Sequence, residues 1–192
     1  MIDIGDDVYV FDNIIDINLQ KIIENKLLHE KVFEWYYLDD VTKPGDGQQK
    51  RPGFQHSFIW EEKQNSPFHD LVKPIIINAC QRLGLSPKKY LSGRSFLQLP
   101  LSISDDKDDS PHIDRTEDHI VVLYYVIDSD GETIIYNNKY RGEEDLPDYE
   151  NLKEKQRVMP KQGRVVCFDG YYWHTSQQPS KGTRCIINYN VV

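Results

Sequence analysis

Two histidines and one aspartate in this 192-residue chain have the chemistry and spacing to hold one metal ion. His112 and Asp114 stand two residues apart, so on an extended strand both side chains point to the same face. That pair alone is weak evidence, because with six histidines such a spacing arises by chance in about every second protein of this composition. His174 can complete the group, since two imidazoles and one carboxylate on one face of an iron ion leave three positions open.

An arginine that follows His174 adds a second chemical function. The segment 183–192 alternates polar and apolar residues, which places Arg184, Asn188 and Asn190 on one face of a strand. An arginine that points into a β-structure needs an anion, and its guanidinium matches a carboxylate through two parallel hydrogen bonds. The sequence also allows a structural ion pair, for which Asp169 is a candidate.

Two amphipathic helices are predicted in the first half of the chain. Residues 18–30 carry apolar side chains at helical spacing, with Asn18 or Asp16 as the N-cap. A second helix follows Ser66 and ends at Gly84, and Pro74 either bends it or delays its start.

The rest of the chain has the pattern of short strands separated by turn residues. The predicted strands cover residues 32–38, 54–60, 95–99, 120–127, 133–136, 156–159, 164–168 and 183–192, and the segment 130–133 is predicted to be a tight hairpin turn. This order predicts an α+β fold over a single domain, residues 1–192, whose C-terminal half is a sandwich or barrel with the helices packed on one sheet. Its central strands should be buried on both faces.

In this order, the features resemble the Fe(II)/2-oxoglutarate-dependent oxygenases, and within them the prolyl-4-hydroxylase-like branch. The resemblance covers about residues 94–192. It rests on His112-Ile113-Asp114, on Leu123-Tyr124-Tyr125-Val126 with Gly131-Glu132-Thr133, on residues 158–164, and on His174 with Pro179, Gly182, Thr183 and Arg184. It implies a double-stranded β-helix, the jelly-roll or cupin-like architecture, over residues 94–192, with residues 1–93 as a supporting region of helices and strands.

The resemblance also assigns roles at the site. It implies that His112, Asp114 and His174 bind Fe(II) and that Arg184 binds the far carboxylate of 2-oxoglutarate. A tyrosine on the strand after the first two ligands assists Arg184 in many relatives. Here that residue is Tyr125, because it shares a face with Leu123, and Tyr124 is the alternative.

Two further positions bear on the co-substrate. Gln98 falls where relatives often place a polar group near 2-oxoglutarate, although an exposed strand residue is an equal alternative. Many relatives carry Ser or Thr two residues after the arginine, where this chain has Ile186, so a second contact to the carboxylate must come from Tyr125 or Asn188.

The activity that the resemblance implies is oxidation of a substrate with O2. 2-Oxoglutarate would be converted to succinate and CO2, an aliphatic carbon of a prolyl-like peptide or a small molecule would be hydroxylated, and ascorbate could serve as reductant. Collagen-type hydroxylases have Lys where this chain has Arg184, so the resemblance gives less support to a collagen-like substrate for this chain. The alternatives are a non-catalytic metal- or ligand-binding protein of the same architecture and a cupin-type isomerase, neither of which needs Arg184.

Composition limits the possible partners. The formal net charge of −8 disfavours nucleic acid as a partner, because such binding needs a basic surface. No apolar run is long enough to span a membrane and the first residues lack a signal-peptide pattern, so we expect a cytoplasmic protein. The sequence gives no indication of oligomeric state.

Residues around the predicted site suggest how a substrate could bind. Arg94 and Arg115 could contact a substrate from the rim. The acidic loop Asp105–Asp109 is expected to be solvated and to lie near the mouth of the site, where it would suit a basic substrate. His119 is expected at the start of a strand, either exposed or in a capping role.

Overall fold

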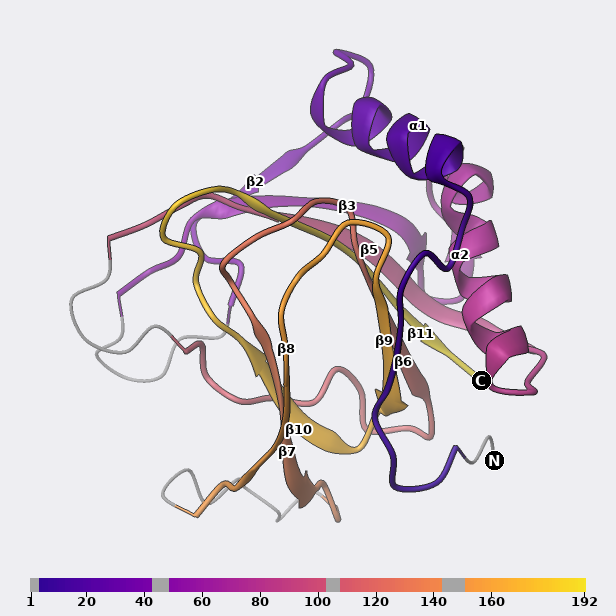
Figure 1. The fold of residues 1–192 in the computed structure, drawn as a ribbon, viewed down its shortest axis with the longest axis vertical. Helices are drawn as coiled ribbons and strands as arrows, with labels where there is room; N and C mark the ends of the chain where they lie inside the picture. The colour runs from indigo at the N-terminus through magenta and orange to yellow at the C-terminus, as the bar shows by residue number, and fades with distance from the viewer. Residues whose placement is uncertain (1–3, 43–48, 103–107, 143–150) are drawn as a thin grey trace.

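Two antiparallel sheets lie face to face, and two helices cover the outer face of the larger one (Figure 1). The computed structural model describes residues 4–42, 49–102, 108–142 and 151–192. The large sheet has the order β1-β9-β6-β11-β5-β3-β2, with β4 paired to β3, and the small sheet has the order β10-β7-β8. The strands are β1 (Tyr9–Phe11), β2 (Tyr36–Leu38), β3 (Gly53–Trp60), β4 (Lys63–Gln64), β5 (Tyr90–Gln98), β6 (Ile120–Tyr125), β7 (Thr133–Lys139), β8 (Glu154–Val158), β9 (Val165–Asp169), β10 (Tyr172–Ser176) and β11 (Arg184–Val191).

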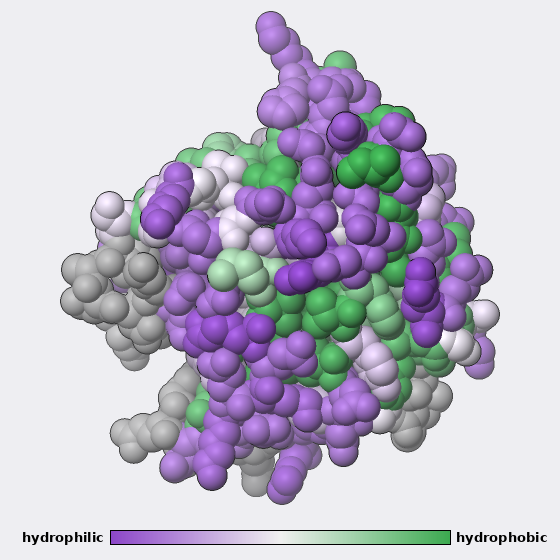
Figure 2. Space-filling view, in the orientation of Figure 1, coloured by the Kyte–Doolittle hydropathy of each residue, from purple (hydrophilic) through white to green (hydrophobic). Residues whose placement is uncertain are grey.

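Both predicted helices are present. Helix α1 covers Ile17–Leu28, and Asp16 is its N-cap because its carboxylate accepts a hydrogen bond from the backbone N–H of Asn18. Helix α2 covers His69–Arg82 and contains Pro74, so the proline does not delay its start. No helix in the described ranges is long and apolar enough to cross a membrane. Figure 2 shows a face that is largely hydrophilic, with hydrophobic side chains gathered near its middle.

Alternation along the central strands divides the core into two layers. On β6, every residue is buried, as predicted for a strand covered on both faces. Val122 and Tyr124 belong to the cluster between the large sheet and the helices, together with Ile23 of α1 and Ile76 of α2. The other face of β6 belongs to the cluster between the two sheets, which contains Val121, Leu123, Tyr125, Ile135, Val158, Val166, Phe168, Tyr172 and Ile186.

The structure corrects several of the expected elements. The predicted hairpin at 130–133 is wrong, because β6 lies in the large sheet and β7 in the small one, so this segment crosses between the sheets. Tertiary contacts hold the crossing: the Asp130 carboxylate accepts hydrogen bonds from the backbone N–H groups of Ser180 and Lys181. Strands β1, β4 and β10 were not predicted, and only the last three residues of the predicted strand 32–38 are extended, as β2.

A buried contact between α2 and the large sheet depends on a glycine in β5. Tyr189 of β11 is fully buried, and its hydroxyl lies 2.8 Å from Nδ1 of His69, the first residue of α2. Its ring covers Gly93, so a Cβ at that position would lie 2.4 Å from the ring. The glycine therefore lets the aromatic ring pack against the backbone of the sheet.

We expect Gly93→Ala to lower the free energy of unfolding by about 1–3 kcal/mol, because the added methyl group forces the Tyr189 ring off its packing position. Urea unfolding of the purified variant measures this change. Gly182→Ala is the control: a Cβ there meets nothing within 4 Å, so the free energy should change by less than about 1 kcal/mol. Equal stability of Gly93→Ala and the wild type would contradict the packing role of Gly93.

Candidate metal centre

The backbone of His112 pairs directly with that of His174. Each residue donates its N–H to the carbonyl of the other, at 2.9 and 3.0 Å, which forms an isolated antiparallel bridge beside β10. Residues directly opposite each other in such a pair place their side chains on the same face. The expectation that His112 and Asp114 lie on a regular strand is wrong, since this segment is irregular and bends at Asp114, but the bridge still brings the imidazoles together.

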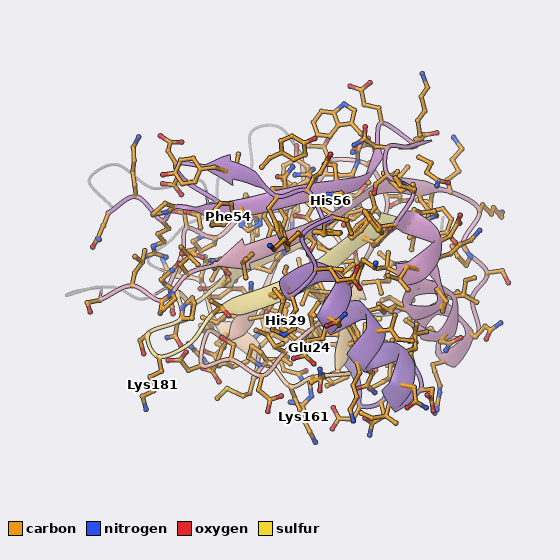
Figure 3. All side chains as sticks on the ribbon, turned by 90° about the horizontal axis from the view of Figure 1, so that it is seen from above. Glu24, His29, Phe54, His56, Lys161 and Lys181 are labelled. Atoms are coloured by element: carbon orange, nitrogen blue, oxygen red, sulfur yellow. The ribbon has the colours of Figure 1, made fainter. Side chains whose placement is uncertain are left out.

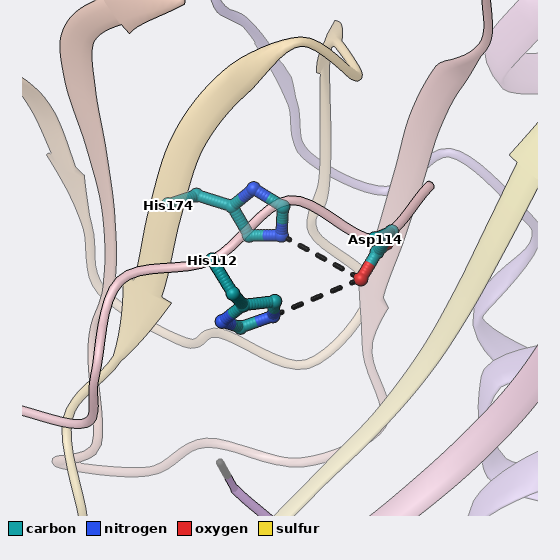
Figure 4. Close-up of side chains that lie close together, drawn as sticks. All are labelled: His112, Asp114 and His174. Carbon is teal, nitrogen blue, oxygen red and sulfur yellow. Dashed lines mark ion pairs between the residues drawn. The ribbon is translucent and has the colours of Figure 1, made fainter. Parts of the chain in front are cut away.

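Three potential metal ligands converge at this bridge (Figure 4). Nε2 of His112 lies 3.7 Å and Nε2 of His174 lies 3.8 Å from Oδ1 of Asp114. One ligand atom from each residue can be chosen so that all three lie within 4.8 Å of one another, and no other group of three or more His, Cys, Asp or Glu side chains in the described parts of the chain does so. Two imidazoles and one carboxylate are the donor set that suits a non-haem iron with open positions.

Hydrogen bonds to the outer ring nitrogens fix the tautomers of both imidazoles. Nδ1 of His174 lies 3.0 Å from the carbonyl of Tyr172, and Nδ1 of His112 lies 3.3 Å from that of Ser110. A carbonyl only accepts, so each Nδ1 carries the proton and each Nε2 keeps a lone pair directed at the site. This is the tautomer that a metal ion requires.

Asp114 is held as a carboxylate and oriented by a neighbouring amide. Burial alone would raise its pKa, but the hydrogen bond and charge of His174 and the charge of His112, which act only while these imidazoles are protonated, and the hydrogen bond from Asn188 hold that pKa well below its usual range. Nδ2 of Asn188 donates to Oδ2 at 2.8 Å, which leaves Oδ1 for a metal ion. Asn188 therefore orients a metal ligand, and its expected contact with the far carboxylate of 2-oxoglutarate stays a prediction.

A buried ion pair anchors the segment that carries His112. The guanidinium of Arg51 pairs with the carboxylate of Asp109, and both side chains are about 2% exposed. Asp109 also accepts a hydrogen bond from the Ser176 hydroxyl, and its carbonyl accepts one from Thr175 of β10 at 2.6 Å. Asp109 is thus buried and neutralised, contrary to the expected solvated acidic loop; residues 105–107 of that loop lie outside the described residues. Sequence patterns gave no signal for Arg51, because its partner is 58 residues away.

Arg184 is a buried cation with no acidic partner in the described parts of the chain. Its side chain is 3% exposed. Nε donates to the carbonyl of Gly131, and the terminal nitrogens donate to Oε1 of Gln98 and Oγ1 of Thr133, all at 2.8–2.9 Å. Asp169 pairs instead with Lys139, so the alternative ion pair is wrong. Three of five N–H donors are used, and the remaining charge calls for an anion.

Tyr124 and Tyr125 are adjacent on β6, so they point to opposite faces of the sheet, and only Tyr125 points toward Arg184. Tyr125 lies beside it, and the Tyr125 hydroxyl donates to Oγ1 of Thr133 at 2.8 Å. Tyr124, the alternative, points to the opposite face of the sheet, into the core beneath the helices, and does not line the cavity. Gln98 is buried and bound to Arg184, so it is not an exposed strand residue.

Thr133 was missed as a site residue, although it ends a motif that the family shares. Its Oγ1 accepts hydrogen bonds from both Tyr125 and Arg184. The proton of its own hydroxyl is therefore free to point toward a ligand.

The remaining candidates lie outside this group. His119 directly precedes β6, as expected, but it is buried and not exposed; its Nδ1 lies 2.7 Å from the carbonyl of Glu117, and burial lowers its pKa. Arg115 pairs with Glu117 and does not line the cavity. His56, which Figure 3 labels on β3, contacts the Glu34 carbonyl and the Ser66 hydroxyl in the core instead of the site.

One cavity of about 270 Å³ contains both the metal-ligand group and Arg184. The His-Asp-His group occupies its wall, and Arg184 lies toward one end with Gln98 and Thr133. Phe96, Leu123 and Ile186 also line it and give it an apolar strip. The metal-ready donor atoms and the buried, unpaired guanidinium fit Fe(II) and a dicarboxylate such as 2-oxoglutarate.

Comparison with solved structures identifies the class of this fold, whereas no protein-family model and no curated protein sequence matches the chain. A structure of the epimerase SnoN in complex with Fe³⁺, α-ketoglutarate and nogalamycin RO aligns with a TM-score of 0.63 and 14% identity, over 97% of this chain and 79% of the SnoN chain. A second SnoN structure aligns over 97% of this chain and 78% of its own length. A 2-oxoglutarate/Fe(II) oxygenase-family oxidoreductase from Burkholderia pseudomallei aligns with a TM-score of 0.66 and 11% identity, over 96% of this chain and 84% of its own chain. A Pseudomonas putida prolyl-4-hydroxylase aligns with a TM-score of 0.59 and 13% identity, over 97% of this chain and 92% of its own chain.

These likenesses establish the fold. The chain has the architecture of the 2-oxoglutarate/Fe(II) oxygenases, and structures similar to it include prolyl hydroxylases. The site geometry described above comes from this chain's own residues.

We expect Arg51→Met to lower the free energy of unfolding by about 3–5 kcal/mol, because it leaves the Asp109 charge buried without its cation. Chemical denaturation measures the change. Lys50→Met is the matched control, since Lys50 pairs with Asp39 at the surface, with both side chains more than two thirds exposed, and its loss should cost less than about 1 kcal/mol. The double variant Arg51→Met/Asp109→Asn should recover part of the loss; no recovery would contradict the ion-pair explanation.

We expect Asn188→Leu to weaken Fe(II) binding by about 10–100-fold, because the Asp114 carboxylate loses the hydrogen bond that orients it. Anaerobic calorimetric titration measures the affinity. Asn65→Ala, which removes an exposed hydrogen bond to the Ser57 carbonyl, is the control and should leave metal binding unchanged. If Asn188→Leu binds Fe(II) as tightly as the wild type, Asn188 does not orient the ligand.

Proposed function

We propose that the protein is a non-haem Fe(II)/2-oxoglutarate-dependent dioxygenase, with a double-stranded β-helix core, that hydroxylates an aliphatic carbon of its substrate. One observation carries the proposal: the cavity that holds the His-Asp-His group also contains the buried cation Arg184, which has no acidic partner among the residues described. A metal-binding protein without oxygen chemistry, or a cupin-type isomerase, has no use for that cation. The similar folds support the same class.

The chain's own residues would divide the work as follows. His112, Asp114 and His174 would hold Fe(II), which with 2-oxoglutarate supplies the activation of O2 and yields succinate and CO2. Arg184 would bind the far carboxylate of 2-oxoglutarate, and the Thr133 hydroxyl would donate to it.

Burial would keep these groups in the required states. Burial raises the pKa of Tyr125, so its hydroxyl stays protonated and keeps Thr133 in position. Phe96, Leu123 and Ile186 would exclude water from the space between Arg184 and the metal ligands.

The proposed activity is compatible with either a peptide or a small molecule as the substrate. SnoN is an epimerase and the Pseudomonas putida protein is a prolyl-4-hydroxylase, so the fold accommodates different reactions and substrates. The negative net charge supports the exclusion of nucleic acid as substrate, and the cytoplasmic location stays a prediction from the sequence.

We expect purified protein supplied with Fe(II), 2-oxoglutarate and ascorbate under air to form succinate slowly even without substrate. Succinate is measured by mass spectrometry against a control without iron. Arg184→Gln should weaken 2-oxoglutarate binding by about 10-fold or more, because the carboxylate loses a charge-assisted fork. Arg115→Gln, which changes a half-buried arginine outside the cavity, should bind it like the wild type. If the iron-loaded wild type forms no succinate, the protein is not a 2-oxoglutarate oxygenase.

A further inference from the structure

The floor of the cavity continues past the metal ligands to a second polar end. Strand pairing between β11 and β5 sets Arg184 opposite Gln98, Ile186 opposite Phe96, Asn188 opposite Arg94 and Asn190 opposite Ser92. All eight side chains line the cavity. Arg94 stands four residues along β5 from Gln98, roughly 13 Å at strand spacing. The floor is thus polar at Arg184, apolar in the middle and polar again at Arg94.

Arg94 presents a guanidinium that the described structure does not neutralise. The side chain is half-buried and makes no hydrogen bond or ion pair with any residue in the described ranges. It contacts the ring of Trp60, with 5.9 Å between the guanidinium carbon and the ring centroid. That contact braces the side chain and leaves its N–H donors available.

Two buried amide oxygens beside Arg94 also lack partners. Asn190 is 2% exposed; its Nδ2 donates to the Ser92 hydroxyl, and its Oδ1 has no partner in the described chain. Oδ1 of Asn188 is likewise unpaired and buried. The orientation of Asn188 is fixed, because its Nδ2 must face the Asp114 carboxylate. Both oxygen atoms are shielded from the cavity, so a ligand would not meet them directly. The N–H donors of Arg94 are therefore the groups at this end that are open to a ligand.

The charges around this end favour an anion over a cation. Asp114 is the only acidic side chain among the described residues that line the cavity, and it is a proposed metal ligand. Asp109 is neutralised by Arg51, and Asp108 lies near Arg157 and Gln177. Of the acidic loop Asp105–Asp109, only Asp108 and Asp109 are described, and neither lines the cavity. The cavity of about 270 Å³ thus offers a second binding end, at Arg94, beside the co-substrate.

We propose that the substrate is a small organic acid whose acid group binds Arg94. This inference rests on the proposed function, because it assigns the Arg184 end to 2-oxoglutarate. The Arg94 end then orients the substrate so that a C–H bond near its acid group faces the metal ligands. Arg94 sets specificity for the acid group.

The test measures binding of defined probes to the metal-free protein by calorimetry and saturation-transfer NMR, with and without saturating 2-oxoglutarate. The probes are the free amino acids, 2-hydroxy acids and O-phosphoserine, each compared with its neutral amide or ester where one exists, and a prolyl peptide with blocked ends. We expect at least one acid to bind in the presence of 2-oxoglutarate and its neutral analogue to bind at least 10-fold more weakly. Comparison of carboxylates with O-phosphoserine distinguishes the two kinds of acid group.

Variants locate the binding. Arg94→Gln should weaken the bound acid at least 10-fold, Arg94→Lys should weaken it less, and Arg115→Gln should leave it unchanged. Thermal unfolding checks that each variant is folded, and the acid-to-amide comparison on the wild type needs no variant.

Several outcomes would overturn the proposal: no acid binds, the neutral analogue or the blocked peptide binds equally well, or binding survives Arg94→Gln. It is also overturned if Arg94→Gln weakens 2-oxoglutarate as much as the probe, because Arg94 would then hold the co-substrate. The proposed function fails separately. If the wild type forms no succinate while an acid still binds through Arg94, the subsite stands and the oxygenase assignment falls.

Discussion

The backbone pairing of His112 with His174 is the interaction on which the site depends. His112 lies on an irregular segment that has no strand of its own. The segment is attached to the small sheet by the two hydrogen bonds between His112 and His174 and by the contacts of Asp109 with Thr175 and Ser176. Asp108 adds contacts with Gln177 and with Arg157 of β8. Once attached, the segment faces the large sheet, where Asn188 fixes the Asp114 carboxylate. The metal group is thus assembled across two sheets, so the packing between the sheets determines its geometry.

The protein buries two arginines, Arg51 and Arg184, whose partners differ in charge. Arg51 is buried with Asp109 and serves structure, because the pair leaves no net charge in the interior. Arg184 is buried with neutral partners, which satisfy three of its donors but not its charge. Burial of such a cation is unfavourable unless a ligand supplies the anion. The two arginines are equally buried, and only their partners tell a structural cation from a ligand-binding one.

Sequence patterns predicted the parts of the molecule that depend on local periodicity. The two helices, the strand that carries Arg184 and the shared face of Tyr125 and Leu123 all follow from alternation or helical spacing. The order of His112, Asp114, His174 and Arg184 predicted the residues that meet in one cavity. Strand β10 was missed because Tyr-Trp-His-Thr-Ser lacks apolar alternation, and its extended shape comes from pairing with β7.

The parts that could not be predicted depend on contacts between distant segments. Nothing local marks Arg51 as the partner of Asp109, or the 130–133 segment as a crossing held by residues near 180. The same limit applies to Arg94, which the sequence could place only at the rim. Its significance comes from register, because the pairing of β5 with β11 places it, like Arg184, among the side chains that line the cavity.

A fold shared at 11–14% identity locates the site but does not choose a substrate. In this cavity the choice falls to the polar end at Arg94. The metal ligands and the Arg184 end would serve any substrate that the class accepts, since they address the metal and the co-substrate. An acid that meets the guanidinium of Arg94 pairs its charge, whereas an apolar ligand would cover that charge without an anion. Desolvation of Arg94 would therefore select against apolar substrates before any chemistry takes place.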